Sequence, residues 1–303
     1  MKFISLLLFL SLLSLSVSAQ MQDSKITGQR IYASHHSYFL GIPALLDEVA
    51  QSANISGQQI VGSDYIGGSK AMLHWIIPDQ KNQAKAALKA GSVDVLILTP
   101  VYLPDDGIEN FASYGLQYNP NTRVTVMEFW LPFDVYNPTI YDGHYKPIAG
   151  EPPPMPKPAK VDHNAATGDG LEKIHQYYFD TMNAHIIALN QKFGKQVIFV
   201  VPVGQAVIAL REKIIAGQAP GIKTQEEIFK DQLGHPQVPI QLLEAYEHFA
   251  VIYHKSPVGL PVPSMLANDK QIPAEDDVPL NTLLEQLAWD AVIHHPLSGV
   301  KGN

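Results

Sequence analysis

A serine stands where the first predicted strand of the chain ends. Residues 30–37 read RIYASHHS, and Gly41-Ile42-Pro43 then turns the chain into a predicted helix. A serine at such a junction lies near helix amides, which favour both an attacking oxygen and a developing oxyanion. The chain has no cysteine, so any nucleophile must be an oxygen or a nitrogen. Ser37 is therefore the candidate nucleophile, and capping of the following helix is its other interpretation.

A candidate acid–base pair lies far along the chain, directly before a predicted helix over residues 240–253. Asp231 and His235 lie close together, and Gly234 and Pro236 predict a loop there rather than a helical turn. In a loop, Asp231 can bend back and hold the imidazole. His235 is therefore the candidate general base, and Asp231 the residue that orients it. A loop histidine beside an ordinary turn aspartate is the other interpretation.

Glycines follow the second predicted strand. Gly67-Gly68 precedes Ser69, and His74-Trp75 comes soon after. Glycines let backbone N–H groups approach a ligand closely, so Gly67 and Gly68 are candidate oxyanion or substrate-binding residues. His74 and Trp75 are candidates for the lining of the same cleft. A simple strand-end turn and core packing are the other interpretations of these four residues.

A predicted parallel sheet positions these residues, because ligands gather beyond the carboxyl ends of parallel strands. Apolar runs rich in β-branched residues alternate with helical stretches, which is typical of a parallel sheet covered on both faces. We therefore predict an α/β fold of three layers (α/β/α) with a flavodoxin-like sheet of five parallel strands. The predicted strands are residues 30–37, 59–66, 93–99, 123–130 and 196–203, and the predicted helices are residues 42–53, 81–90, 171–193, 240–253 and 281–293, the last capped by Asn281.

The N-terminal residues predict an exported protein. Lys2 precedes an apolar run, and Val17-Ser18-Ala19 is typical of a signal-peptide cleavage site before Gln20. We interpret residues 1–20 as a signal peptide; an uncleaved anchor is the alternative, although the run is short for a membrane span of ~20 apolar residues. The mature protein is then expected to be secreted or periplasmic, with no membrane contact after removal of the signal.

The rest of the chain, residues 21–303, is predicted to form a single domain with two additions. Prolines crowd residues 151–158, so residues 136–170 are predicted to form a long surface insertion, either an inert loop or a substrate-facing lid. Residues 258–303 are predicted to form a C-terminal extension. The net charge is −8 and no dense basic stripe occurs, which argues against nucleic acid as a partner.

The order of these motifs resembles that of the SGNH (GDSL-like) hydrolase superfamily, and more particularly its secreted bacterial branch with a Gly-His-Ser type nucleophile turn. The resemblance rests on residues 31–37, 66–69 with 74–75, 231–236, and 249–257. It implies that Ser37 is the nucleophile, His235 the general base and Asp231 its orienting residue. The amides of Ser37 and Gly68 are then oxyanion donors.

The chain departs from the SGNH pattern after the third predicted strand. Members of that superfamily usually have an asparagine there as a third oxyanion donor, whereas residues 99–104 read TPVYLP. Loss of one such donor costs ~3 kcal/mol of transition-state stabilisation. Thr99 is the candidate replacement, with Tyr102 as an alternative, and His36 is a further candidate substrate-binding residue beside the nucleophile.

Several other kinds of site have no support in the sequence. No His-Glu-x-x-His motif, phosphate-binding loop or dinucleotide fingerprint occurs, so no metal and no cofactor is predicted. The Gly-x-Ser-x-Gly elbow of α/β-hydrolases is also missing from the sequence.

The sequence therefore predicts a secreted serine esterase that removes an ester, an O-acetyl group on a carbohydrate being the expected substrate. Trp75, Trp130 and Tyr102 are candidate platforms for sugar rings. A non-catalytic exported glycan-binding protein on the same scaffold is the main alternative, motivated by the missing asparagine. A structural envelope protein that docks through residues 151–158 is a third hypothesis.

Overall fold

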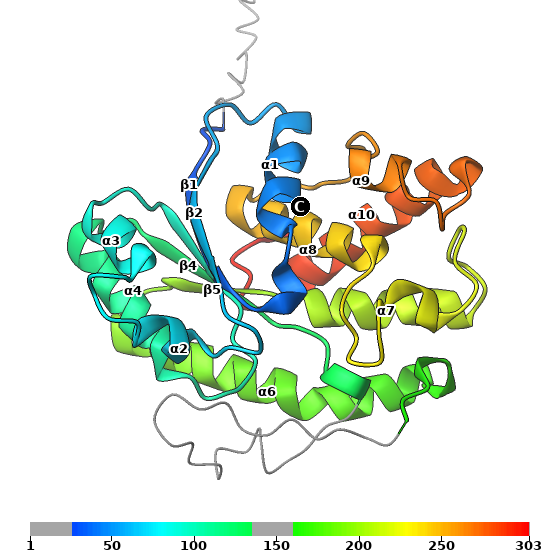
Figure 1. Cartoon of the computed structure of the whole chain (residues 1–303), viewed down its shortest axis with the longest axis horizontal. Coiled ribbons are helices and arrows are strands. Elements are labelled where there is room, and N and C mark those ends of the chain that lie inside the picture. The colour runs from blue at the N-terminus through cyan, green and yellow to red at the C-terminus, as the bar shows by residue number, and fades with distance from the viewer. Residues whose placement is uncertain (1–25, 135–159, 303) are drawn as a thin grey trace, which may run out of the picture.

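The computed structural model of the chain describes residues 26–134 and 160–302 (Figure 1). The predicted signal peptide, residues 1–20, and residues 136–159 of the predicted insertion lie outside the described residues. The end of that predicted insertion is described, and it contains a short 3-10 helix, His163–Ala165, and the start of a long helix at Gly168.

Five parallel strands form one sheet in the order β2-β1-β3-β4-β5, which confirms the predicted fold class. The three inner strands are almost wholly buried because both of their faces are covered, whereas β2, at one edge, alternates between exposed and partly buried residues. The strands are β1 (Arg30–His35), β2 (Gln59–Tyr65), β3 (Val95–Leu98), β4 (Arg123–Met127) and β5 (Ile198–Val201).

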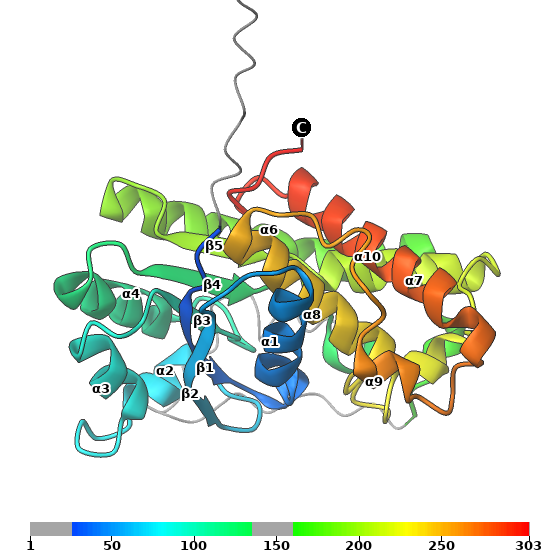
Figure 2. The ribbon, with the colours of Figure 1, turned by 90° about the horizontal axis from the view of Figure 1, so that it is seen from above.

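Helices cover the sheet on both faces, as Figures 1 and 2 show. On one face lie α1 (Ile42–Ser52), α8 (Val238–Tyr253) and α10 (Asp277–His294), with α7 (Val203–Ile215) alongside α10. On the other face lie α2 (Ala71–Trp75), α3 (Gln83–Lys89), α4 (Asp106–Tyr118) and α6 (Gly168–Phe193). A short helix, α9 (Ser264–Ala267), contacts α8 and α10.

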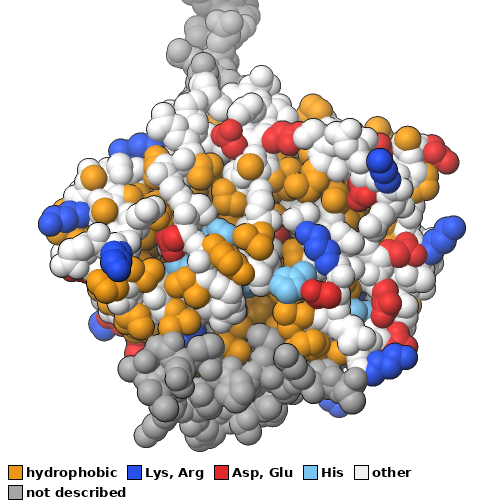
Figure 3. Space-filling model, in the orientation of Figure 1, with side chains coloured by type: hydrophobic (Ala, Val, Ile, Leu, Met, Phe, Trp, Pro, Cys, Tyr) orange, Lys and Arg blue, Asp and Glu red, His pale blue; other side chains and the backbone are white. Residues whose placement is uncertain are grey.

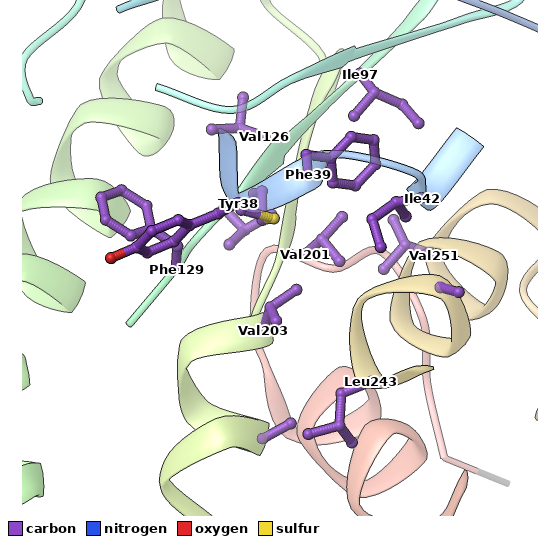
Figure 4. Packing of buried hydrophobic residues seen from close by; sticks show 14 of the residues in the cluster. Tyr38, Phe39, Ile42, Ile97, Val126, Phe129, Val201, Val203, Leu243 and Val251 are labelled. Atoms are coloured by element: carbon purple, nitrogen blue, oxygen red, sulfur yellow. The ribbon is translucent and has the colours of Figure 1, made fainter. Parts of the chain in front are cut away.

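The core runs between β5, α1, α7 and α8. Figure 4 shows Phe39 and Ile42, which follow β1, near Val201 of β5 and Val251 of α8. Helix α8 is buried all round, because it is enclosed by α1, α10, α7 and β5. This packing fixes the direction in which the residues after β1 leave the sheet.

Some predicted boundaries are wrong in ways that the structure explains. The predicted strands are one to three residues too long at their ends, and Val203 begins α7 rather than ending β5. Asn281 is not a helix cap: it lies inside α10, where its Oδ1 accepts a hydrogen bond from Tyr246 and its Nδ2 donates to Glu285. Within the described part of the predicted C-terminal extension, α10 packs against α7 and α8.

No helix within residues 26–134 and 160–302 is both long enough and apolar enough to cross a bilayer.

Candidate active site

Ser37 lies just beyond the carboxyl end of β1. A short 3-10 helix, Ser37–Phe39, begins at this residue, and Gly41 then adopts a left-handed backbone (φ +86°) that starts α1. The backbone N–H of His36 donates to Thr99 Oγ1 over 3.0 Å, which ties the end of β1 to the end of β3. The chain leaves these neighbouring strands in opposite directions along the sheet, and such a switch point is where open α/β sheets bind ligands.

Asp231 and His235 lie in one tight hairpin before α8. Phe229 and Pro236 form an antiparallel bridge, and the turn is closed by the N–H of Gly234 donating to the carbonyl of Asp231 over 3.0 Å. Gly234 adopts φ +94°, a left-handed conformation that a side chain would strain. The predicted loop therefore brings the carboxylate back to the imidazole.

The Asp231 carboxylate holds the imidazole through both of its oxygens. Its Oδ2 lies 2.7 Å from His235 Nδ1, and its Oδ1 accepts from the N–H groups of Gly234 (3.1 Å) and His235 (3.2 Å). Partial burial raises the pKa of Asp231, but the bonds from the His235 ring and from these amides outweigh it, so the pKa lies below its usual value. The carboxylate is therefore ionised, and it makes Nδ1 the protonated nitrogen of neutral His235.

The other ring nitrogen of His235 meets the candidate nucleophile. His235 Nε2 lies 2.9 Å from Ser37 Oγ, although the two residues are 198 positions apart in the sequence. With the proton on Nδ1, Nε2 is the acceptor and the Ser37 hydroxyl is the donor. Ser37, His235 and Asp231 thus form a continuous hydrogen-bond chain of the kind that activates a serine oxygen.

Two aromatic residues hold the hairpin in place: Trp130, a predicted sugar platform, and Tyr38, which is not among the predicted site residues. The Trp130 indole N–H donates to the carbonyl of Gly234 over 2.9 Å, and the Tyr38 hydroxyl donates to that of Leu233 over 2.6 Å. The rings of Tyr38 and Trp130 stack at 4.7 Å, and the Tyr38 ring meets His235 edge-on at 5.3 Å. Tyr38 directly follows the nucleophile in the sequence, and that position is the only signal that pointed to it.

A small apolar cavity of about 60 Å³ opens beside Ser37. Figure 3 shows the surrounding surface: histidine and hydrophobic side chains lie near the middle of this face, and most lysine and arginine side chains lie toward its margins. The cavity is lined by His36, Ser37, Tyr38, Gly68, Val101, Phe129, Pro132 and Leu233.

Two solved structures are similar to this chain. One is a "putative GDSL-like lipase" from Parabacteroides merdae ATCC 43184, with 12% identity, a TM-score of 0.42, and coverage of 75% of this chain and 97% of that chain. The other is a "putative SGNH hydrolase" from Slackia heliotrinireducens, with 13% identity, a TM-score of 0.39, and coverage of 73% and 97%. No protein-family profile and no curated protein matches the sequence.

The predicted oxyanion residues are placed differently from one another. Gly68 lines the cavity with a left-handed backbone (φ +58°), whereas Gly67 lies beside the Tyr65 hydroxyl and is not part of the cavity wall. Thr99 is buried, and its Oγ1 accepts the His36 N–H. Thr99 therefore fixes the end of β1 and is not among the residues that line the cavity.

His36 lines the cavity as a neutral ring. Burial, with the nearby histidines adding to it, lowers the pKa of His36 to about 3. Its Nδ1 accepts the N–H of Tyr38 over 3.2 Å, so the ring proton is on Nε2. Nε2 is buried and has no hydrogen-bond partner among the described residues, so His36 has one unused donor.

The remaining predicted residues do not reach the cavity. His74 is buried behind the turn that contains Gly68, where it bonds to Ser69 and Asp64. Trp75 packs edge-on against Phe111 at 5.2 Å, on the helical layer. The sequence pattern did not single out Asp64, because its partner in space is ten residues away.

Of the three predicted sugar platforms, Trp130 and Tyr102 are wrong. Trp130 is 1% exposed and Tyr102 is 2% exposed, so neither ring offers a face to a sugar. Trp130 instead supports the hairpin, as described above.

Within the described residues, no three His, Cys, Asp or Glu side chains lie close enough together to hold a metal ion.

Proposed function

We propose that this chain is a serine esterase that hydrolyses short-chain esters, with an O-acetyl group on a carbohydrate as the expected substrate. The observation that carries the proposal is the chain of hydrogen bonds from Asp231 through His235 to Ser37, beside a small apolar cavity. An acyl group seated in the cavity has its carbonyl carbon next to Ser37 Oγ. The carbohydrate part rests on the resemblance of the sequence motifs and on the predicted export.

The reaction proceeds through an acyl-serine. Ser37 Oγ attacks the acyl carbon while His235 Nε2 takes its proton, and Asp231 stabilises the imidazolium that forms. The tetrahedral intermediate collapses and expels the alkoxide, which receives the proton from His235. A water molecule, deprotonated in turn by His235, then adds to the acyl carbon, and the second collapse releases the carboxylic acid and restores Ser37.

The size of the cavity favours a short acyl group. A single water needs ~10–15 Å³ of such space, so a cavity of about 60 Å³ holds only a few non-hydrogen atoms. One extra methylene in a tight pocket changes kcat/KM by about 10-fold or more. We therefore expect p-nitrophenyl acetate to be hydrolysed faster than the butyrate.

Widening the cavity tests this explanation of acyl preference. Val101 lines the wall, so Val101→Ala is expected to narrow the acetate-to-butyrate ratio of kcat/KM by about 10-fold. Val61 is exposed on edge strand β2 and does not line the cavity, so Val61→Ala is the matched control. An unchanged ratio in the Val101→Ala protein would show that the acyl group binds elsewhere.

Three donors are available for the developing oxyanion in this proposal. The amides of Ser37 and Gly68 follow from the resemblance, and both residues line the cavity. His36 also lines the cavity, and its buried Nε2–H has no protein acceptor among the described residues, so we propose that it turns to the oxyanion as the third donor. It takes the place of the asparagine that residues 99–104 lack.

Labelling with a fluorophosphonate tests the whole proposal. The purified protein should form a single covalent adduct, and peptide mapping should place it on Ser37. Ser37→Ala should abolish labelling and lower kcat by about 10⁴-fold or more. Ser56 is exposed and precedes β2 at the opposite end of the sheet, so Ser56→Ala should label like the wild type. Labelling of the Ser37→Ala protein at the wild-type rate would disprove the assignment.

A glycan-binding protein without turnover is the second candidate. The observation that favours it is that the Thr99 hydroxyl accepts the His36 N–H. Thr99 stands in the position of the usual asparagine, and its hydroxyl is bonded to the protein backbone and does not line the cavity. This candidate predicts saturable glycan binding and no adduct on Ser37 in folded protein.

We also propose that the protein acts outside the cytoplasm, because residues 1–20 have the features of a signal peptide. N-terminal sequencing of protein from the culture medium or periplasm should show a chain that begins just after Val17-Ser18-Ala19, at Gln20 or Met21. Recovery of a chain that retains Lys2 from the membrane fraction would instead support an uncleaved anchor.

A further inference from the structure

A second Asp-His-Ser hydrogen-bond chain lies behind the cavity. His74 Nε2 lies 2.8 Å from Ser69 Oγ, and His74 Nδ1 bonds to Asp64 Oδ2. The other oxygen of Asp64 accepts from the Ser34 hydroxyl over 2.9 Å, which anchors the chain to β1. Ser69 and His74 are each only 1% exposed, so this serine cannot meet a substrate. We call Asp64, His74 and Ser69 the buried relay.

The buried relay ends at the turn that faces Ser37. Ser69 directly follows Gly68, whose backbone lines the cavity. With His74 Nδ1–H donating to the Asp64 carboxylate, Nε2 accepts the Ser69 hydroxyl proton. The Ser69 carbonyl also accepts the N–H of Val101 over 3.1 Å, so the hydroxyl and the carbonyl of Ser69 are both fixed.

The far side of the same turn is held by a different carboxylate. Asp105 is buried at the start of α4 and accepts the N–H groups of Ala71 (2.5 Å) and Met72 (3.0 Å). Two glycines would otherwise leave residues 66–69 free to adopt many backbone conformations. The turn is therefore held on both sides, and the relay acts on the side next to Gly68.

We propose that the buried relay positions the Gly68 amide as an oxyanion donor, with Asp64, His74 and Ser69 as positioning residues. This inference rests on the proposed esterase function. An oxyanion donor works only within 2.7–3.1 Å of the place that the oxyanion will occupy, so a small shift of the turn lowers the rate. The relay is anchored to β1 by Ser34 and reaches the cavity only through the turn, so we expect its loss to affect the transition state and to leave substrate binding in the ground state unchanged.

Ser69→Ala is the test, because it removes one oxygen atom and leaves the backbone in place. We expect kcat for p-nitrophenyl acetate to fall by about 10- to 100-fold with KM within about 2-fold, as for loss of a transition-state interaction. His74→Gln should give a loss of the same kind. In parallel, amide hydrogen exchange of the peptide that spans residues 66–70 should become faster in the Ser69→Ala protein.

A matched control removes a similar hydrogen bond from the same strand as Asp64. Ser63 Oγ lies 2.9 Å from His35 Nε2. The His35 carbonyl accepts the N–H of Ile66 over 3.0 Å, but that backbone bond does not involve the Ser63 hydroxyl and stays in the Ser63→Ala protein. Ser63→Ala should keep kcat within about 2-fold of the wild type and leave exchange at residues 66–70 unchanged.

The outcomes separate this inference from the proposed function. If the wild type labels at Ser37 but Ser69→Ala keeps normal kcat and normal exchange, the relay has no positioning role and the esterase proposal stands. If the wild type neither labels nor turns over, the esterase proposal and the inference fall together. If the Ser69→Ala protein is misfolded, His74→Gln decides: normal kcat there overturns the inference, and a selective fall in kcat supports it.

Discussion

Replacing Asp231 by asparagine should be more damaging than replacing it by alanine. Asp231 Oδ1 accepts from two backbone N–H groups, and Oδ2 faces His235 Nδ1. In the Asp231→Asn protein, the two N–H groups select the amide oxygen, so the NH₂ group faces Nδ1. Nδ1 must then accept, and the ring proton moves to Nε2, which can no longer take the Ser37 proton.

The magnitude follows from these hydrogen bonds. Turning the asparagine over would set its NH₂ against two donors and lose two bonds of ~1 kcal/mol each. Losing the charge-assisted bond to the ring costs ~1.5–3 kcal/mol, and the lower end applies because the Asp231 side chain is 49% exposed. Together these terms, about 3.5 kcal/mol, predict a fall in kcat of about 300-fold for Asp231→Asn at about 1.4 kcal/mol per decade. The Asp231→Ala protein leaves the ring free to choose its tautomer and should lose only about 10- to 100-fold.

The assay is kcat/KM for p-nitrophenyl acetate near pH 8, with the fluorophosphonate labelling rate as a second readout. Gln232 is exposed in the same hairpin, so Gln232→Ala should stay within about 2-fold of the wild type. An Asp231→Asn protein as active as Asp231→Ala, or more active, would refute the tautomer argument. It would mean that the two backbone N–H groups do not fix the side chain.

Three further predictions concern single positions. Gly234→Ala places a side chain on a residue with φ +94°, with its Cβ 3.2 Å from Trp130 Nε1. We expect the free energy of unfolding, measured in urea, to fall by ~1–3 kcal/mol and kcat to be lower. Unchanged values would mean that the hairpin tolerates a side chain at this position. His36→Phe removes the unused Nε2–H together with the Nδ1 that accepts the Tyr38 N–H, and should lower kcat by about 10²- to 10³-fold with little change in KM, whereas an equal rise in KM would indicate ground-state binding instead. Burial raises the pKa of Glu247 well above its usual value, and two neighbouring carboxyls add to this, so the folded state keeps a proton that the unfolded state loses above about pH 4.5. The free energy of unfolding should therefore fall as the pH rises from 5 to 8, and in urea unfolding this fall should be smaller for the Glu247→Gln protein. If the free energy falls with pH equally in the wild type and the variant, Glu247 ionises freely in the folded protein.

The fold was predictable where the hydrophobicity of a segment matches its burial in the structure. Residues 95–98 (VLIL) are apolar because β3 is covered on both faces, so a continuous apolar run was enough to identify the strand. Asn281 was misread because asparagine at the start of an apolar helix usually caps it. Here a tertiary contact decides: the Tyr246 hydroxyl needs a buried acceptor, and Asn281 supplies it from inside α10.

The site was predictable in part for a similar reason. The structure brings Ser37, His235 and Asp231 together, because residues at the ends of parallel strands and in the adjoining loops share one edge of the sheet. The side of the turn on which His74 lies was not predictable, because short helices such as α2 leave little periodicity to orient a side chain. His74 points toward Asp64 of β2, a pairing that only the three-dimensional structure reveals.

The hairpin before α8 has a consequence for how the site assembles. Of the two contacts in the chain from Asp231 to Ser37, one spans four residues and the other spans 198. The acid and the base can therefore meet early, as a local unit, while the serine is delivered separately by the first strand. Only one long-range contact, that between Ser37 and His235, then remains to be formed, and the stacked rings of Tyr38 and Trp130 support it. Substitutions that disturb the packing between β1 and α8 are then expected to inactivate the protein in the same way. They separate Ser37 from His235 and leave the pair of Asp231 and His235 intact.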